Sequence, residues 1–360
     1  MKPGKKATIT KAWATWDGTN GNDTVTVKAK EYVTVNTKKG NDKIYLKKGN
    51  WHQINAGAGD DVITVTKGNN HSIDVGSGKK DKVTVNGGNS HVIGNFTTGA
   101  TGNVTIIINN GKHHAINAGA PGKNVKVYLN GGHTDSIITW EGNDTVVVSG
   151  KGNMSNKAWQ YVNPARKCAI DTGSGKDSVT FEAKNGKGFI AYTGAGNDTI
   201  TIKNGKKHQV HTDAGNDKVK ITGGTGHIVY LDTGKNGVTM ENTKATVYTK
   251  EDAVDNITIK WNQNKTNNYT IKTPEIISTS YYGITDSLTV KGIKSSAVTF
   301  ADKNGTLIMS AAGGSISIDH FDESWKWNNG MFGTTNFGNG IKFDDGLLSL
   351  DAVRKRISGI

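Results

Sequence analysis

The sequence predicts an all-β fold, a right-handed parallel β-roll or β-solenoid of about twelve coils with a β-rich C-terminal cap. Two observations lead to this prediction. A polar turn string recurs about every 20 residues, and apolar residues alternate with polar ones after each copy. The composition agrees, because 47 of the 360 residues are Gly and only 4 are Pro. Abundant Thr, Val, Asn and Asp suit short strands joined by tight turns.

The turn string is the first element of each coil. It reads GNDTVTV from Gly21 and returns as GNDKIYL from Gly40, GDDVITV from Gly59, GNDTITI from Gly196 and GNDKVKI from Gly215. The apolar residues that follow lie two apart, so one face of each strand is buried. A coil this short cannot form a core alone, and stacking on neighbours about 4.8 Å away supplies that core.

A second short strand follows each first strand about ten residues later, so each coil has two strands and two turns. In the fifth and sixth coils, Gly102 and Lys123 take the place that Asp holds in most coils, and Asn236 takes it in a later coil. One insertion, at about 150–167, interrupts the period. We therefore assign the β-roll to residues 1–260 and a C-terminal capping region to residues 261–360.

The Asp that ends each turn string is a candidate calcium ligand. Calcium prefers several oxygen ligands, and a Gly-rich turn can direct successive carbonyls at one point because Gly accepts positive φ. A site needs two good neighbouring turns, which makes Asp144 a poor candidate. The alternative is that these Asp residues only accept hydrogen bonds from turn N–H groups. The candidate metal ligands are Asp177, Asp198 and Asp217 with Gly173, Gly175, Gly194, Gly196 and Gly215, then Asp42 and Asp61 with Gly40, Gly57 and Gly59, extending to Asp23 and Asp81.

These turns resemble a known family. The strings GAGDD (57–61), GSGKD (173–177) and GAGND (194–198) look like the calcium-binding motif of repeats-in-toxin (RTX, haemolysin-type) proteins, and the resemblance covers about residues 17–260. Segments within 286–353 are similar to the region that follows such repeats in type I secreted proteins. The resemblance implies folding on extracellular calcium, passage through a type I exporter, and a secreted or cell-surface location.

Two features depart from that family. Only one side of the roll carries the Gly-Asp turn, and the chain has a formal charge of +13 whereas relatives are usually acidic. A basic chain favours anionic partners such as acidic polysaccharide or an anionic surface, although the charge can also simply keep a solenoid soluble. No motif for specific nucleic-acid binding and no apolar run of about 18 residues for a transmembrane helix is present.

A row of histidines marks the second turn. These residues are His52, His71, His91, His133, His208 and His227, with His114 close to the same phase. Stacked imidazoles can bind a transition metal or respond to pH, but we expect a polar ladder that closes the turn. Such a ladder predicts that the solenoid loosens in mild acid.

The sequence favours a non-enzymatic structural or adhesion module over two alternatives. The first alternative is a polyanion- or glycan-binding module that uses lysine-rich faces. The second is a polysaccharide lyase, hydrolase or epimerase, for which Asp171, Tyr192, His211 and Asp232 are the candidate residues because they share one phase before the Gly turn.

Overall fold

The computed structural model describes residues 4–94, 102–119, 123–131, 136–150, 170–250, 253–265, 267–272, 286–319 and 340–358. His133 and nearly all of the insertion at about 150–167 lie outside these residues. The chain forms two compact units, Met1–Gly194 and Ala195–Ile360, and each is described by itself.

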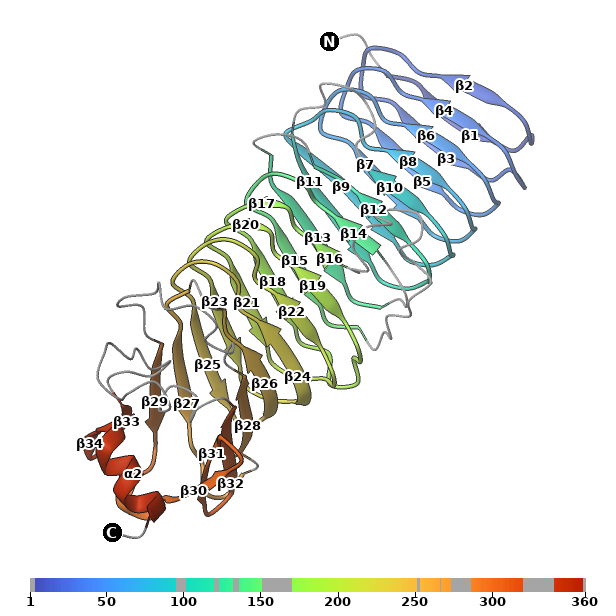
Figure 1. The fold of residues 1–360 in the computed structure, drawn as a ribbon. Helices are drawn as coiled ribbons and strands as arrows, with labels where there is room; N and C mark the ends of the chain where they lie inside the picture. Colours follow the sequence, from blue (N-terminus) through green and yellow to red (C-terminus); the bar gives the residue numbers. More distant parts are fainter. Residues whose placement is uncertain are drawn as a thin grey trace. The chain divides into compact units, whose positions relative to one another are not determined.

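The first unit is a stack of coils in which the strand pairs between described residues are parallel (Figure 1). Its first sheet runs in the order β1 (Lys6–Ile9), β3 (Thr24–Val27), β5 (Lys43–Leu46), β7 (Val62–Val65), β9 (Lys80–Val85), β11 (Asn103–Ile108), β13 (Val125–Leu129), β15 (Thr145–Val148) and β18 (Ser178–Phe181). Its second sheet runs in the order β2 (Thr15–Asp17), β4 (Thr34–Asn36), β6 (Gln53–Asn55), β8 (Ser72–Asp74), β10 (Val92–Gly94), β12 (Ala115–Asn117), β14 (Ser136–Ile138), β16 (Ile170–Asp171) and β19 (Ile190–Tyr192). The short β17 (Ser174–Gly175) lies in a turn.

The second unit continues the same plan and ends in antiparallel hairpins. Its parallel strands are β21 (Thr199–Ile202), β23 (Lys218–Ile221), β25 (Gly237–Glu241), β27 (Asn256–Lys260) and β29 (Ser287–Lys291) in one sheet, and β22 (Gln209–His211), β24 (Thr225–Tyr230), β26 (Lys244–Tyr248) and β28 (Asn267–Lys272) in the other, with the short β20 (Ala195–Gly196) in a turn. The last elements are η2 (Ser295–Ala297), β30 (Thr299–Lys303), β31 (Thr306–Ala311), β32 (Gly314–Asp319), β33 (Ile341–Phe343), β34 (Gly346–Leu348) and α2 (Leu350–Ser358). The prediction of an all-β parallel solenoid with a β-rich C-terminal end is confirmed.

The core follows directly from the alternation in the sequence. Val25, Ile44 and Ile63 are partners in successive coils and are at most 1 % exposed. The residues between them, such as Thr26 and Tyr45, lie on the outer face of the same strands. Each of these three strands thus contributes two buried side chains to a narrow apolar column, which the neighbouring coils extend.

The register of the fifth and sixth coils corrects the sequence analysis. Val104 pairs with Asp81, and Val125 pairs with Val104. The position that Asp holds in other coils is therefore held by buried valines and not by Gly102 and Lys123. Strand pairing rather than a fixed residue count sets the register of these two strands.

Glycines fit where one coil comes close to the next. At Gly68, φ is +116°, and an added Cβ would lie 1.9 Å from the Gly49 carbonyl oxygen and 2.6 Å from Nε2 of His71. A side chain cannot be accommodated there without moving the neighbouring backbone. Gly188 also has positive φ, +70°, but an added Cβ would meet nothing within 4 Å.

This contrast gives a test of coil packing. We expect Gly68→Ala to lower the free energy of unfolding by about 2–4 kcal/mol, because it combines backbone strain with a backbone clash. Gly188→Ala has the strain alone and should cost about 1 kcal/mol. Urea unfolding followed by circular dichroism measures both values. Equal losses in the two variants would contradict the close approach at Gly68.

Candidate functional site

The predicted aspartates lie inside the turn and form a buried column, here called the acidic ladder. None of its members is more than 8 % exposed. In the first unit the acidic ladder consists of Asp23, Asp42, Asp61, Asp81, Asp144 and Asp177, and in the second unit of Asp198, Asp217, Asp255 and Asp286.

In most members of the acidic ladder, one carboxyl oxygen accepts a backbone hydrogen bond from the neighbouring coil, whereas neither oxygen of Asp255 has a partner. The N–H of Asp42 donates to Oδ1 of Asp61 at 2.7 Å, and the N–H of Asp61 donates to Oδ1 of Asp81 at 2.9 Å. The second unit repeats the contact, since the N–H of Asp198 donates to Oδ1 of Asp217 at 2.8 Å. This geometry supports the alternative in which the aspartates satisfy turn N–H groups.

The second oxygen is different. Oδ2 has no hydrogen-bond partner in five members of the described ladder, which are Asp42, Asp61, Asp144, Asp217 and Asp255. Asp23, at the start of the ladder, is satisfied, because its Oδ2 accepts the N–H of Thr19 at 2.7 Å. Buried oxygens without a donor are costly, so these five oxygens indicate a missing proton or cation.

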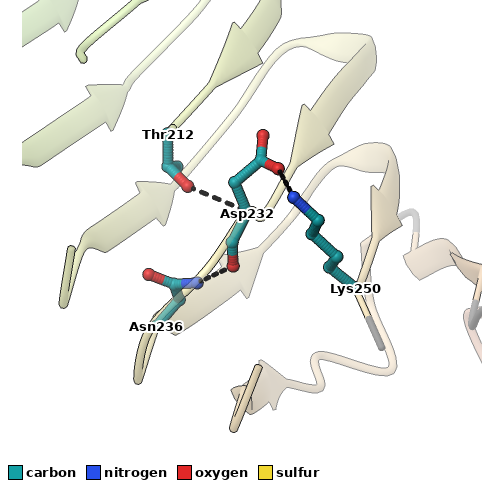
Figure 2. A network of polar contacts seen from close by, with 4 residues as sticks. All are labelled: Thr212, Asp232, Asn236 and Lys250. Carbon is teal, nitrogen blue, oxygen red and sulfur yellow. Dashed lines mark hydrogen bonds and ion pairs between the residues drawn. The ribbon is translucent and has the colours of Figure 1, made fainter. Parts of the chain in front are cut away.

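Asn236 shows which group lies next to the second polar atom of a side chain at a ladder position. It follows Asp217 in the ladder and accepts the Asp217 N–H on Oδ1 at 3.0 Å. Its Nδ2 donates to the carbonyl oxygen of Asp232, four residues earlier, at 2.9 Å (Figure 2). An Asp in the same conformation places an oxygen where Asn236 has an N–H. We infer that two oxygens then face each other unless a proton or a cation lies between them.

Burial also raises the pKa of the ladder carboxyls. It raises the pKa of Asp61 and of Asp255 to about 8, and neighbouring carboxylates add to the rise. Burial raises the pKa of Asp217 to about 7, and the charge of Asp198 adds to it. The column therefore favours neutralisation near neutral pH.

The structure places the predicted ligands as follows. Asp42, Asp61 and Asp81 are consecutive members of one ladder, and Gly40, Gly57 and Gly59 have positive φ in the adjoining turns. The other predicted set is divided between the units. Asp177, Gly173, Gly175 and Gly194 belong to the first unit, and Asp198, Asp217, Gly196 and Gly215 belong to the second.

Two ladder contacts were missed by the sequence analysis. Asp144 was expected to have poor neighbours, but its N–H donates to Oδ1 of Asp177 at 2.7 Å, since the insertion leaves the register intact. Asp286 also joins the ladder, because the N–H of Asp255 donates to its Oδ1 at 2.9 Å. The string DSLTV from Asp286 carries the same Asp and alternating pattern as the earlier turns, and this signal could have revealed it.

The oxygen atoms of these turns are of the type that calcium prefers as ligands, although most of the turn carbonyls already accept a hydrogen bond. Turn carbonyls already accept hydrogen bonds, such as Lys38 from the Ala58 N–H at 2.6 Å and Gly57 from the Ser77 N–H at 2.7 Å. Each carbonyl oxygen keeps a second lone pair that can ligate an ion. Within the described parts of the chain, no group of three or more His, Cys, Asp or Glu gathers as a metal cluster. Calcium would thus be held by Oδ2 atoms of adjacent coils with turn carbonyls.

The histidines form a second buried column, here called the imidazole ladder. It consists of His52, His71, His91 and His114 in the first unit, and of His208 and His227 in the second. Neighbouring rings stack with centroids 4.8 to 5.0 Å apart. The N–H of His52 donates to Nδ1 of His71 at 3.2 Å, and Nε2 of His52 lies 3.1 Å from the Lys48 carbonyl oxygen. The expected turn-closing ladder is confirmed.

This ladder holds its imidazoles neutral. Nδ1 accepts a hydrogen bond, so the proton lies on Nε2. Burial lowers the pKa of His71 to about 3 and that of His91 to about 4, and the charges of neighbouring histidines lower the first further. Protonation would remove the Nδ1 acceptor and place adjacent positive charges in a buried column.

The row considered for catalysis is not assembled as expected. In the first unit Asp171 pairs with Tyr192. In the second, His211 pairs with Tyr230, and their rings stack at 4.4 Å. The prediction that Asp232 shares this row is wrong. Asp232 lies in the following turn, where its carboxylate binds Nζ of Lys250 at 2.7 Å and its N–H donates to Oγ1 of Thr212 at 3.3 Å (Figure 2).

Comparison with protein-family models and with curated proteins finds no match to this chain. The RTX resemblance therefore depends on the turn motif and on the C-terminal segments alone. Among the residues that the structure describes, no helix has the length and apolar character needed to cross a membrane.

The imidazole ladder predicts acid sensitivity. Because the folded-state pKa of His71 is below its unfolded value, the stability that neutral His71 contributes is present above about pH 6.5 and is lost as pH falls towards 3. We expect His71→Asn, which keeps a δ1 acceptor, to lose less stability than the wild type between pH 6.5 and 3. Thermal unfolding at a series of pH values measures the difference. Exposed His113 is the control residue. If His113→Asn changed the pH dependence of the melting temperature as much as His71→Asn does, the attribution of acid sensitivity to the imidazole ladder would be contradicted.

The acidic ladder predicts the opposite dependence in chelator. Because the folded-state pKa of Asp61 is raised, stability falls as pH rises from about 4 to 8. Asp61→Asn keeps the Oδ1 acceptor and removes the charge, as Asn236 does naturally. We expect it to stabilise the protein by about 1–3 kcal/mol at pH 8 and by much less at pH 4. Asp60→Asn, in the same turn, is the control, since the Asp60 carboxylate accepts the Lys79 N–H from outside the ladder. A loss of stability at pH 8 in Asp61→Asn would contradict the prediction.

Proposed function

We propose that this chain is a calcium-stabilised β-solenoid of the RTX type that acts outside the cell as a non-enzymatic structural or adhesion module. The observation that supports calcium most directly is the row of buried Oδ2 atoms without a donor, at Asp42, Asp61, Asp144, Asp217 and Asp255. A divalent cation supplies the positive charge that this row lacks, and oxygen is the ligand calcium prefers.

Calcium binding would control folding through electrostatics. Ionised carboxylates one coil apart repel one another, and this repulsion opposes the stacking that forms the core. An ion between two coils changes repulsion into attraction, so the free energy of binding adds to that of folding. At low calcium the chain would remain loosely folded and suited to export. Extracellular calcium, at about millimolar concentration, fills weak sites of this kind.

Export and location depend on the resemblance of the C-terminal segments to those of type I secreted proteins. A type I exporter would be the partner during secretion, and the mature solenoid would lie outside the cell or on its surface. The role in adhesion is supported by the formal charge of +13, which favours contact with anionic surfaces.

A calcium titration at pH 8 tests the proposal. We expect millimolar calcium to raise the melting temperature above that in chelator, with about 2.7 kcal/mol of stabilisation at a free concentration 100 times Kd. Magnesium should have a weaker effect, because it requires a smaller octahedral site. Circular dichroism and titration calorimetry are the measurements.

A matched variant separates calcium from protons. Asp61→Asn with Asp217→Asn should be more stable than the wild type in chelator and should respond less to calcium, since two ladder charges are gone. If the wild type has the same melting temperature with calcium as with chelator and shows no heat of binding, the ladder is neutralised by protons alone and the proposal fails.

A further inference from the structure

The first unit carries an exposed column of aromatic rings on the turn that also holds the imidazole ladder. Trp13, Tyr32 and Trp51 lie at the same position of three successive coils. The ring centroids of Trp13 and Tyr32 are 4.2 Å apart, and those of Tyr32 and Trp51 are 5.4 Å apart. The three side chains are 71 %, 38 % and 46 % exposed. We call this column the aromatic stack.

The turn itself does not require aromatic residues. All three have positive φ, between 48° and 60°, a conformation that bulky residues rarely adopt. The next two coils have Asn70 and Ser90 at the same position, each with φ of 58°. Small polar residues therefore satisfy the backbone, and large apolar rings there add strain and exposure. This choice in three consecutive coils indicates a role beyond folding.

Stacking determines which parts of the rings a ligand can reach. Both faces of Tyr32 are covered by its neighbours, so its exposed part is the ring edge with the hydroxyl group. The edge of an aromatic ring carries positive electrostatic potential, and the indole N–H and phenol O–H groups are hydrogen-bond donors. The exposed strip therefore favours ligands rich in oxygen acceptors and negative charge.

Lysines lie near this strip in the sequence. The exposed lysines within four residues before the aromatic residue of their own coil are Lys11, Lys28, Lys30, Lys47 and Lys48. Glu31 is the acidic residue in these three turn segments, and it is half-buried. The excess of ammonium groups beside donor-bearing ring edges is complementary to an anionic chain that also carries hydroxyl groups.

We propose that the aromatic stack and Lys11, Lys30 and Lys48 form a binding surface for a linear acidic polysaccharide. Carboxylate or sulfate groups would pair with the ammonium groups, and sugar hydroxyls would accept from the indole and phenol donors. Single-stranded nucleic acid is less suited, because its bases stack on open ring faces. Tyr32 is stacked on both sides and offers none, and Trp13 and Trp51 each keep only their outer face. The inference deepens the proposed adhesion role, and it does not require calcium at the acidic ladder.

Binding can be measured on the full chain with fluorescently labelled polygalacturonate and chondroitin sulfate, which separate carboxylate from sulfate chemistry. Neutral dextran, a poly(dT) oligonucleotide and anionic lipid vesicles are the comparison probes. We expect Trp13→Ser, Tyr32→Ser and Trp51→Ser together to weaken polysaccharide binding about tenfold or more. Lys11→Gln with Lys30→Gln and Lys48→Gln should weaken it similarly and reduce its salt dependence.

The chain supplies matched controls. Trp140 is 54 % exposed with φ of 68° and lies on the opposite turn, so Trp140→Ser should leave affinity within about twofold. Lys38, Lys39 and Lys79 are exposed on that opposite turn. Lys38→Gln with Lys39→Gln and Lys79→Gln removes the same number of charges as the stack-lysine variant and so tests net charge alone. Melting temperatures confirm that each variant folds. If the triple aromatic variant does not fold, the binding measurement is made with Trp13→Ser alone.

The results distinguish binding at the aromatic stack from diffuse charge attraction and from binding of another ligand. Equal losses in the stack variants and in the opposite-turn controls would show diffuse charge attraction and overturn the proposal. Tighter binding of poly(dT) or vesicles through the same residues would assign the surface to another ligand and also overturn it. Because binding is measured both in calcium and in chelator on folded protein, failure of the calcium proposal is recorded separately.

Discussion

The interaction on which this solenoid depends is a hydrogen bond between a backbone N–H in a turn and a buried side-chain acceptor of the next coil. The strands satisfy their own backbone groups through parallel pairing, but the turns cannot do so alone. A buried N–H without a partner costs about 1–3 kcal/mol, and the cost would recur in every coil. Asp61 and His71 perform the same task on opposite turns of the coil, each accepting the N–H of the preceding ladder member.

The two ladders differ in the second polar atom of the side chain. Asn236 has Nδ2, and a neutral His has Nε2–H, so each can donate to a carbonyl four residues earlier, as His52 and Asn236 do. Aspartate has an oxygen there. At His52 this contact satisfies the neutral ring, whereas Nε2 of His71, His91 and His227 is buried without a hydrogen-bond partner. The acidic ladder differs because its second atoms are oxygens, so that it lacks positive charge. Protonation therefore destabilises the imidazole ladder, whereas protons or cations stabilise the acidic ladder.

Because the coils stack in register, a residue type that recurs at the same position of successive coils forms a continuous column on the surface. Asn50, Asn69 and Asn89 form an amide column through side-chain hydrogen bonds of 3.1 and 3.2 Å. The aromatic stack beside it arises from the same geometry. The difference is that amides in a column satisfy one another, whereas the aromatic edges and the lysines remain open to a partner.

The sequence by itself determined the coil, because its period and its alternation of apolar residues are local patterns that stacking requires. It also determined which positions carry Asp and His, since these recur at a fixed phase. Only the tertiary structure decided where that phase continues. Strand pairing placed Val104 and Val125 in the acidic column, joined Asp144 to Asp177 and added Asp286, because hydrogen bonds between coils fix the register despite insertions. The tertiary structure also assembled Trp13, Tyr32 and Trp51, whose flanking residues share no motif, since a side chain's neighbour in a solenoid lies one coil away in space.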